Sequence, residues 1–341
     1  MILTQTPFRI TLGGGGTDLP SFYERHGGCV FAMTIDKHMY IMLHRLPVTE
    51  RKTLIRYSQV EVVDQIEDIR HPLAREALRL HDVREYVEVS SIADLPAKTG
   101  LGSSGAYLVG LLTAIRALRG QPAEPARVAE EACRIEMDIL KEPVGKQDQY
   151  MAAFGGFRVL NIAKDGAVTV ESVPVDFMTS MELATKARMY YTGIQRSATA
   201  VLRDQDAAAR RAAGADHERV VDSLCRIKEI GTAIRKAFAD RDLDAFGRLM
   251  HEHWEVKKRM SARITLSRVD ELYDEVRRRF GVLGGKIIGA GGGGFLMLYC
   301  PAKGRDLDAF MSENDMPRVS YFPAARGARV IADVAGLEER E

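Results

Sequence analysis

The sequence predicts an α+β fold in which a strand-rich first half precedes a mostly helical second half. Three observations support this prediction. The first 90 residues alternate β-branched and aromatic residues with polar ones, which is typical of strands. Residues 197–280 instead repeat apolar residues at helical spacing. The chain then ends on a strand, helix and strand pattern, and its 341 residues suffice for two domains, predicted as 1–180 and 181–341.

The first half combines short strands with two helices. Residues 103–118 are apolar on nearly all sides, which predicts a helix buried in the core rather than one on the surface. A second helix is predicted from Pro125 to about Leu140, because proline is favoured in the first helical turn. The predicted strands of this half are 30–35, 40–43, 53–57, 60–63, 86–89, 156–161 and 168–173.

The second half begins with a predicted strand at 188–192 and is then mainly helical. Its predicted helices are 197–208, 215–239, 242–260 and 268–280. At the end of the chain, the predicted order is a strand segment at 285–299, a helix at 306–313 and a strand at 319–321. The pattern contains no internal repeat and no low-complexity linker.

The composition is that of a folded protein without a nucleic-acid or membrane partner. Lysine and arginine number 48 against 47 aspartate and glutamate, so the net charge is only +1 and any anion must be held by local groups. The four cysteines have neither a zinc spacing nor a disulfide-dense pattern, which favours a reducing compartment. No run of 18 apolar residues and no basic leader occur, so we expect a cytoplasmic protein.

Two glycine-rich segments lie in the first half. Residues 7–18 place Arg9 inside a strand and Asp18 just after four glycines, which is compatible either with a site or with a flexible turn and a solvated Asp18. Residues 96–105 run directly into the buried helix, where the free N–H groups, the helix dipole and the hydroxyls of Ser103 and Ser104 favour an anion. The second segment therefore predicts a phosphate-binding loop.

Two segments, 100–105 and 289–294, formally match the dinucleotide pattern GxGxxG. A dinucleotide fold also needs a following helix and then a strand with an acidic residue about 20 positions on. Here the helix at 103–118 leads through a Gly-Gln-Pro turn into another helix, so an oxidoreductase is disfavoured. The Walker A pattern GxxxxGK[ST] is absent from the sequence as well.

Two carboxylates follow the predicted phosphate loop. Glu136 projects from the apolar stripe of its predicted helix, where a charge is costly unless a cation neutralises it. That cation is either an arginine or lysine, or a divalent metal shared with a serine hydroxyl and phosphate oxygens. Asp148 begins a short apolar segment, and taken alone it is best interpreted as a helix cap.

The order of these segments resembles that of the GHMP small-molecule kinases. The resemblance rests on residues 7–18, on the loop 96–105 and on the C-terminal segment 286–294, and it spans almost the whole chain. It implies an N-terminal ribosomal-protein-S5-like domain and a C-terminal ferredoxin-like domain. Within the family, residues 192–197 and 253–258 look most like members that phosphorylate a heptose 7-phosphate at C1.

The resemblance also implies roles for individual residues, with ATP and Mg²⁺ as cofactors. ATP phosphates would lie on Lys98, Gly100, Leu101, Gly102, Ser103, Ser104 and Gly105. Ser104 and Glu136 would hold Mg²⁺, Asp148 would be the catalytic base, and Arg9 would keep it ionised and spread transition-state charge. The implied acceptor ligands are Gly15, Gly16, Thr17, Asp18, Gly291, Gly292 and Gly293.

A phosphorylated acceptor further requires cations, for which Arg196, Lys257 and Lys258 are the candidates. For the two lysines the alternative is a solvated helix face. In galactokinase-like members, bulkier residues precede the Thr-Asp pair, whereas this sequence has four glycines there. The sugar contacts of galactokinase therefore cannot be assigned to these positions.

The alternative functions are an anomeric kinase of an unphosphorylated hexose and a catalytically silent sugar sensor. His251 and His253 lack a zinc spacing. A homodimer is possible.

Overall fold

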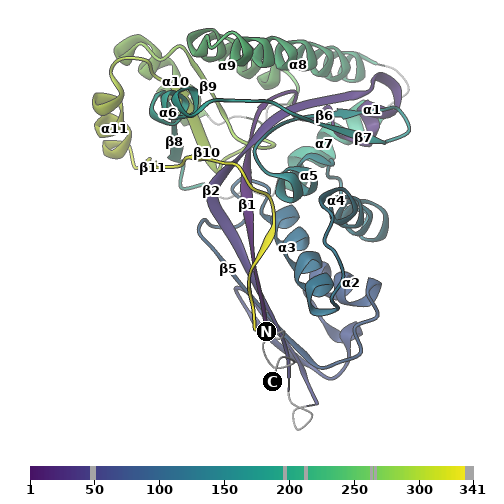
Figure 1. The fold of residues 1–341 in the computed structure, drawn as a ribbon. Helices are drawn as coiled ribbons and strands as arrows, with labels where there is room; N and C mark the ends of the chain where they lie inside the picture. The colour runs from purple at the N-terminus through teal and green to yellow at the C-terminus, as the bar shows by residue number, and fades with distance from the viewer. Residues whose placement is uncertain (47–50, 195–197, 211–213, 262–263, 265–266, 335–341) are drawn as a thin grey trace.

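The computed structural model describes residues 1–46, 51–194, 198–210, 214–261, 264 and 267–334. The described part contains two sheets, as Figure 1 shows. The larger sheet has the strand order β13-β1-β2-β5-β3-β4, with β12 and β6 also paired to β2 and β7 paired to β6. The smaller sheet has the order β11-β8-β10-β9. The α+β fold predicted from the sequence is confirmed.

The large sheet is built around two long antiparallel strands, β1 and β2. Strand β2 joins the predicted strands 30–35 and 40–43 into one, because a register shift at Pro7 and Phe8 of β1 accommodates the polar residues Asp36 and Lys37. The strands of this sheet up to residue 172 are β1 (Ile2–Gly13), β2 (Gly28–Arg45), β3 (Thr53–Arg56), β4 (Val60–Val63), β5 (Val87–Ala93), β6 (Phe157–Ile162) and β7 (Val168–Ser172).

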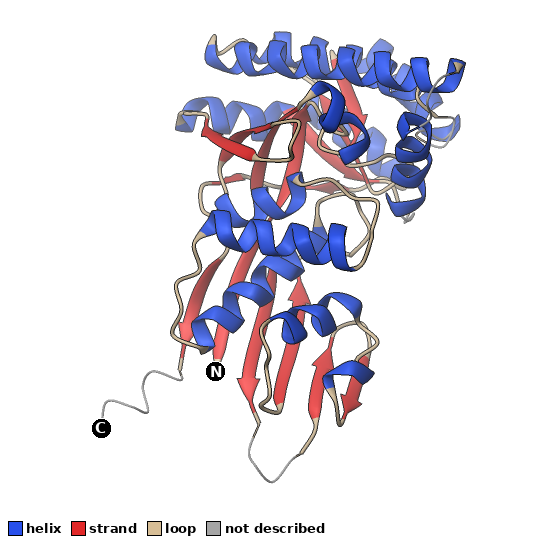
Figure 2. Cartoon of the chain, turned by 90° about the vertical axis from the view of Figure 1, so that its right-hand side faces the viewer, coloured by secondary structure: helices blue, strands red, loops and turns tan. Residues whose placement is uncertain are grey.

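Helix α3 (Ser103–Leu118) lies against β1 and β2, and α2, α4 and α5 surround it on the same face of the sheet (Figures 1 and 2). Its residues from Gly105 to Arg116 are all buried, which explains why its sequence is apolar on every side. The other helical segments of the first half are α1 (Pro20–His26), α2 (Pro72–Leu80), α4 (Pro125–Cys133), η2 (Arg134–Ile139) and α5 (Gln147–Phe154), with a 3₁₀ turn η1 (Ile66–Asp68).

The second half packs its helices around the small sheet and onto the end of β1. Helices α8 and α9 lie side by side, and α9 contacts β9. The helices here are α6 (Phe177–Lys186), α7 (Ala198–Arg210), α8 (Ala215–Ala239), α9 (Leu243–Lys258), α10 (Ser267–Phe280) and α11 (Gly304–Glu313). The small sheet consists of β8 (Ala187–Tyr191), β9 (Gly284–Ile287), β10 (Phe295–Tyr299) and β11 (Arg318–Val319).

The end of the chain departs from the predicted division at residue 180. Strands β12 (Pro323–Ala324) and β13 (Arg329–Asp333) pair with β2 and β1, so they belong to the first sheet rather than to a second domain of residues 181–341. Two short strands far along the chain carry little periodicity, and only their partners define them. No helix in the described part of the chain combines the length and apolarity needed to cross a membrane.

Candidate active site

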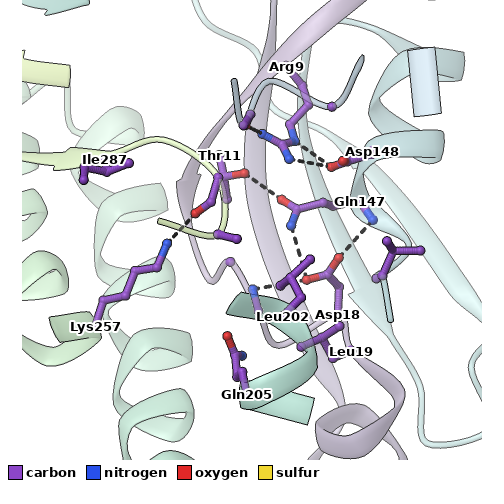
Figure 3. Close-up of a pocket in the computed structure, with 18 of the residues that line it drawn as sticks. Arg9, Thr11, Asp18, Leu19, Gln147, Asp148, Leu202, Gln205, Lys257 and Ile287 are labelled. Atoms are coloured by element: carbon purple, nitrogen blue, oxygen red, sulfur yellow. Dashed lines mark hydrogen bonds and ion pairs between the residues drawn. The ribbon is translucent and has the colours of Figure 1, made fainter. Parts of the chain in front are cut away.

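A cavity of about 260 Å³ lies where the end of β1, the loop before α3, the start of α5 and the second half of the chain meet. Figure 3 shows its side chains converging from these elements. Its lining includes Arg9, Thr11, Gly15, Gly16, Asp18, Lys98, Gly100, Gly102, Ser103, Ser104, Gln147, Asp148, Gln205, His253, Lys257, Lys286 and Gly289. The structure thus brings together residues from all three glycine-rich segments.

The loop before α3 brings Lys98, Gly100 and Gly102 to the cavity. Lys98, Gly100 and Gly102 have φ of 62°, 84° and 79°, so the chain turns sharply three times before the helix begins at Ser103. No side chain caps this helix, so the N–H groups of its first turn remain available to an anion. Leu101 is 1% exposed and contributes only its carbonyl, which accepts from the N–H of Arg9 at 3.1 Å.

Asp148 lies in the first turn of α5 and pairs with Arg9. Its Oδ1 accepts from Nε of Arg9 at 2.7 Å and lies 2.6 Å from Nη2. The third donor of Arg9, Nη1, binds the carbonyl of Gly100 at 2.6 Å. Arg9 therefore fixes the carboxylate beside the phosphate loop. The helix-cap interpretation of Asp148 is wrong, because no side chain caps α5.

Gly105, in the first turn of α3, lies directly against Asp148 in the first turn of α5. A Cβ at this position would lie 2.8 Å from Cβ of Asp148 and 2.9 Å from its carbonyl carbon. On the catalytic role that the family resemblance implies for Asp148, we expect Gly105→Ala to displace this carboxylate and to lower kcat about tenfold or more in a steady-state ADP-release assay. Gly120→Ala is the control: its Cβ meets nothing within 4 Å but its φ is 64°, so it should lose thermal stability and keep its kcat. Equal kcat values for the two variants would contradict this positioning role.

Asp18 is buried and held in place, not solvated. Its Oδ1 accepts from the N–H of Gly16 at 3.1 Å and from Nε2 of Gln147 at 3.3 Å, and its Oδ2 accepts from the N–H of Gln147 at 3.1 Å. Burial, and secondarily the nearby charge of Asp148, raise the pKa of Asp18, although the hydrogen bond from the N–H of Gln147 and the charge of Arg9 oppose the shift. The side chain is only 1% exposed and lies on the cavity wall.

Glu136 lies on η2, a π-helical segment that interrupts the run from α4. Its carboxylate is 2% exposed, accepts from Nε2 of Gln149 at 2.5 Å and is hydrogen-bonded by the hydroxyl of Ser104. Burial raises its pKa to about 7, and the charge of Asp148 adds to the shift. The alternative of a buried ion pair is wrong, since no lysine or arginine of the described residues pairs with Glu136.

Ser104 and Glu136 fit a divalent cation that also uses phosphate oxygens. Hydroxyl and carboxylate oxygens are ligands that Mg²⁺ prefers, and Mg²⁺ in kinases takes few protein ligands. Within the described residues, no group of three His, Cys, Asp or Glu side chains could hold a metal by itself. The buried carboxylate without a protein cation is what such an ion would neutralise.

Comparison with known proteins agrees with this geometry. Residues 70–156 match the family model of the GHMP kinase N-terminal domain, and residues 234–311 match that of the C-terminal domain. This chain belongs to the GHMP kinases. GHMP kinases are phosphotransferases that use ATP as the phosphate donor, and so this chain is a phosphotransferase with an alcohol group as acceptor.

Several relatives cover nearly the whole chain of this GHMP kinase. A D-glycero-alpha-D-manno-heptose 7-phosphate kinase of Campylobacter jejuni is 24% identical over 308 residues, 87% of this chain and 89% of its own length. An L-fucokinase/L-fucose-1-P guanylyltransferase of Bacteroides fragilis is 24% identical over 86% of this chain and 34% of its own length. The solved D-glycero-D-manno-heptose 1-phosphate kinase of Bacteroides thetaiotaomicron shares the fold, with a TM-score of 0.78, 20% identity and coverage of 98% of this chain and 99% of that one.

Some residues predicted to touch the acceptor do not face the cavity of this GHMP kinase. Thr17 is fully buried, and its hydroxyl lies 2.8 Å from the carbonyl oxygen of Gly14 and accepts from the N–H of Cys29 at 3.0 Å. The glycines 291–293 are absent from the cavity lining. Added Cβ atoms at Gly291 and Gly293 would lie 2.9 Å and 2.6 Å from the carbonyl oxygens of Ile264 and Ile194, so these two glycines allow close packing of backbone.

The two neighbouring lysines of α9 have different surroundings. Lys257 is 7% exposed, lines the cavity and donates to the carbonyl of Gly289. The solvated-face alternative is therefore wrong for this residue. Lys258 instead pairs with Glu255 at 2.7 Å and lies 3.7 Å from Asp270, away from the cavity lining. Consecutive helical residues point about 100° apart, so only one of them can face the cavity. Arg196 lies outside the described residues.

Sequence reasoning assigned no role to several residues that line the cavity. Lys286 is the first residue of the C-terminal segment 286–294, His253 lies one turn before Lys257, and Gln147 precedes Asp148. Gln147 connects Asp18 to strand β1, because it donates to Asp18 and accepts from the hydroxyl of Thr11 at 2.6 Å. In the sequence, His253 and Lys286 are notable only because they lie in the segments 253–258 and 286–294. Membership of such a segment does not show whether a side chain is buried.

Proposed function

We propose that this GHMP kinase transfers the γ-phosphoryl group of ATP to the anomeric C1 hydroxyl of D-glycero-D-manno-heptose 7-phosphate, yielding the 1,7-bisphosphate for GDP-heptose biosynthesis. The observation that carries the proposal is the joint placement of Asp148, Arg9 and Asp18 beside the phosphate loop in one cavity. The similarity to the Campylobacter jejuni heptose 7-phosphate kinase over 87% of the chain supports the acceptor.

In the proposed reaction, Asp148 is the general base. Its carboxylate takes the proton of the C1 hydroxyl while the C1 oxygen bonds to the γ-phosphorus and the bond to the β,γ-bridging oxygen breaks, releasing ADP. Arg9 orients this carboxylate through its Nε and Nη2, and its charge lies where negative charge accumulates in the transition state. The N–H groups at the start of α3, with Lys98 beside them, bind the donor phosphates.

Ser104 and Glu136 would hold Mg²⁺ in this proposal. When bound, the ion supplies charge neutralisation for the phosphate oxygens of ATP. Gln149 holds the Glu136 carboxylate toward Ser104, so the two ligands are preorganised by the protein itself.

The acceptor would be bound by the first glycine segment. Asp18 accepts hydrogen bonds from sugar hydroxyls, and Gly15 and Gly16 let the ring approach the backbone closely. The 7-phosphate would be bound by Lys257, with Arg196 as a further proposed ligand. We further propose that the enzyme acts in the cytoplasm, a location that suits its four free cysteines.

The second candidate acceptor is an unphosphorylated hexose such as fucose or galactose. It is favoured by the similarity to the Bacteroides fragilis L-fucokinase, at the same 24% identity. A catalytically silent sensor is disfavoured, because Asp148, Ser104 and Glu136 are all present and Asp148 and Ser104 line the same cavity.

A substrate panel tests the proposal. ADP release is measured with heptose 7-phosphate, mannose 6-phosphate, galactose, fucose and mevalonate. We expect kcat/KM for heptose 7-phosphate to exceed that for each unphosphorylated hexose by about 100-fold or more, because a charge-assisted phosphate contact contributes several kcal/mol. A product phosphorylated at C1, identified by ³¹P NMR, is also expected. A preference for fucose or galactose would favour the hexose kinase instead.

A further inference from the structure

Three basic side chains from the second half of the chain line the same cavity. They are His253 and Lys257 of α9 and Lys286 of β9, and their exposed fractions are 2%, 7% and 3%. His253 and Lys257 are four residues apart and so lie on one face of the helix. Figure 3 shows Lys257 extending from its helix toward the cavity. They line the same cavity as the residues that carry the proposed chemistry.

The donors of these three side chains are largely unused. Each lysine has three donors. In the described structure each lysine donates one hydrogen bond. Nζ of Lys286 donates to the carbonyl of Leu12 at 2.9 Å, and Nζ of Lys257 donates to the carbonyl of Gly289. Both ring nitrogens of His253 are buried without a partner. In the described part of the chain, no carboxylate forms an ion pair with either lysine.

Like charges gathered out of water are costly without an anion. Burial lowers the pKa of Lys257 to about 8, and the charge of Arg9 contributes. Burial, Lys257 and Arg9 hold the pKa of Lys286 well below its ordinary value. Burial, together with the charges of Lys286 and Lys257, holds the pKa of His253 well below its ordinary value. A ligand that carries negative charge would relieve the desolvation and the mutual repulsion at once.

We infer that Lys257, Lys286 and His253 form a buried subsite for the acceptor's own phosphate group, the one that the reaction does not transfer. The inference rests on the proposed function and names two residues for which that function assigned no task. The donor phosphates already have the N-terminus of α3, Lys98 and Ser104. Three buried basic side chains with several donors between them match the several acceptor oxygens of a phosphate better than they match a neutral hydroxyl.

The test uses Lys257→Met and Lys286→Met in the full-length enzyme. Methionine keeps the length and removes the charge, and an apolar side chain at a buried site should leave the thermal stability equal or higher. Lys258→Met is the matched control, since Lys258 pairs with Glu255 outside the cavity. We expect each test variant to lower the ratio of kcat/KM for heptose 7-phosphate to kcat/KM for the unphosphorylated heptose by about tenfold or more, mainly through KM.

A second measurement needs no acceptor. Inorganic phosphate is titrated into the nucleotide-free enzyme by calorimetry, and the ring protons of His253 are followed by NMR. Phosphate should bind wild type and the Lys258→Met control, should bind the test variants about tenfold or more weakly, and should raise the pKa of His253, because an anion favours the imidazolium. If these results hold while heptose 7-phosphate is not a substrate, the proposed acceptor fails and the phosphate subsite stands.

Two results would overturn the subsite while the proposed function stands. In the first, wild type phosphorylates heptose 7-phosphate but the test variants bind and discriminate as wild type does. In the second, kcat falls equally for the phosphorylated and unphosphorylated acceptor with KM unchanged, which would mean that the lysines act on the transferred phosphoryl group.

Discussion

Replacing Asp148 by Asn should lower kcat by about 100-fold or more and leave the affinity for ATP close to that of wild type. The amide cannot take the proton of the acceptor hydroxyl, and a general-base contribution acts on the transition state rather than on the bound substrate. Because Asn keeps the shape of the side chain, its amide oxygen can still accept from Nε and Nη2 of Arg9, and the loop around Gly100 should stay in place. Steady-state ADP release and calorimetric ATP binding measure the two quantities.

The matched control is Asp138→Asn, which removes an exposed carboxylate from the end of the π-helical segment. It should retain the kcat of wild type, since surface substitutions away from the cavity have small effects. A large loss of ATP affinity in Asp148→Asn would instead show that this carboxylate mainly organises the phosphate loop through Arg9. In that case the catalytic base would have to be sought elsewhere.

The sequence was most informative for elements whose structure follows from the residue pattern of a single segment. Helix α3 starts and ends at the predicted residues, because an all-apolar helix after a glycine loop has few alternatives. Helix α8 also agrees with its predicted range of 215–239. Glu136 was recognised as buried because it interrupts an apolar stripe, and the structure confirms its burial at 2% exposure.

What the sequence could not predict depends on distant partners. Strand β13 is defined only by its pairing with β1, more than 300 residues away in the chain. The π-helical turn at Glu136 follows from packing and has no signature in single-residue propensities. Lys257 and Lys258 are chemically identical, so only the orientation of α9 shows which of them faces the cavity.

Helices α1, α2 and α6 were missed for another reason. They are only 7, 9 and 10 residues long, and all three lack an acidic residue in the first turn. A segment of that length holds about two turns, which is too short for an apolar stripe to be distinguished from irregular structure. Each instead packs against another element of the fold: α1 contacts α7 and α8, α2 contacts α3, and α6 contacts β8.

Replacing Glu136 by Gln should abolish most Mg²⁺-dependent turnover, by about 100-fold or more, and should stabilise the ligand-free protein at alkaline pH. The amide is a poor Mg²⁺ ligand but has the same volume, and it can still accept from Gln149.

The stability effect follows from the pKa of Glu136, which rises from 4.5 in the unfolded chain to about 7 in the folded protein because of burial. A raised carboxylate pKa favours the protonated form in the folded state, so this stability is present below pH 4.5 and is lost as the pH rises through 7. Wild type should therefore lose about 3 kcal/mol relative to Glu136→Gln between these limits. Urea denaturation in EDTA at pH values from about 5 to 8, with activity measured against Mg²⁺ concentration, tests both effects. Undiminished turnover at low Mg²⁺ would contradict the metal role, and a pH-independent stability difference would contradict the buried, uncompensated carboxylate.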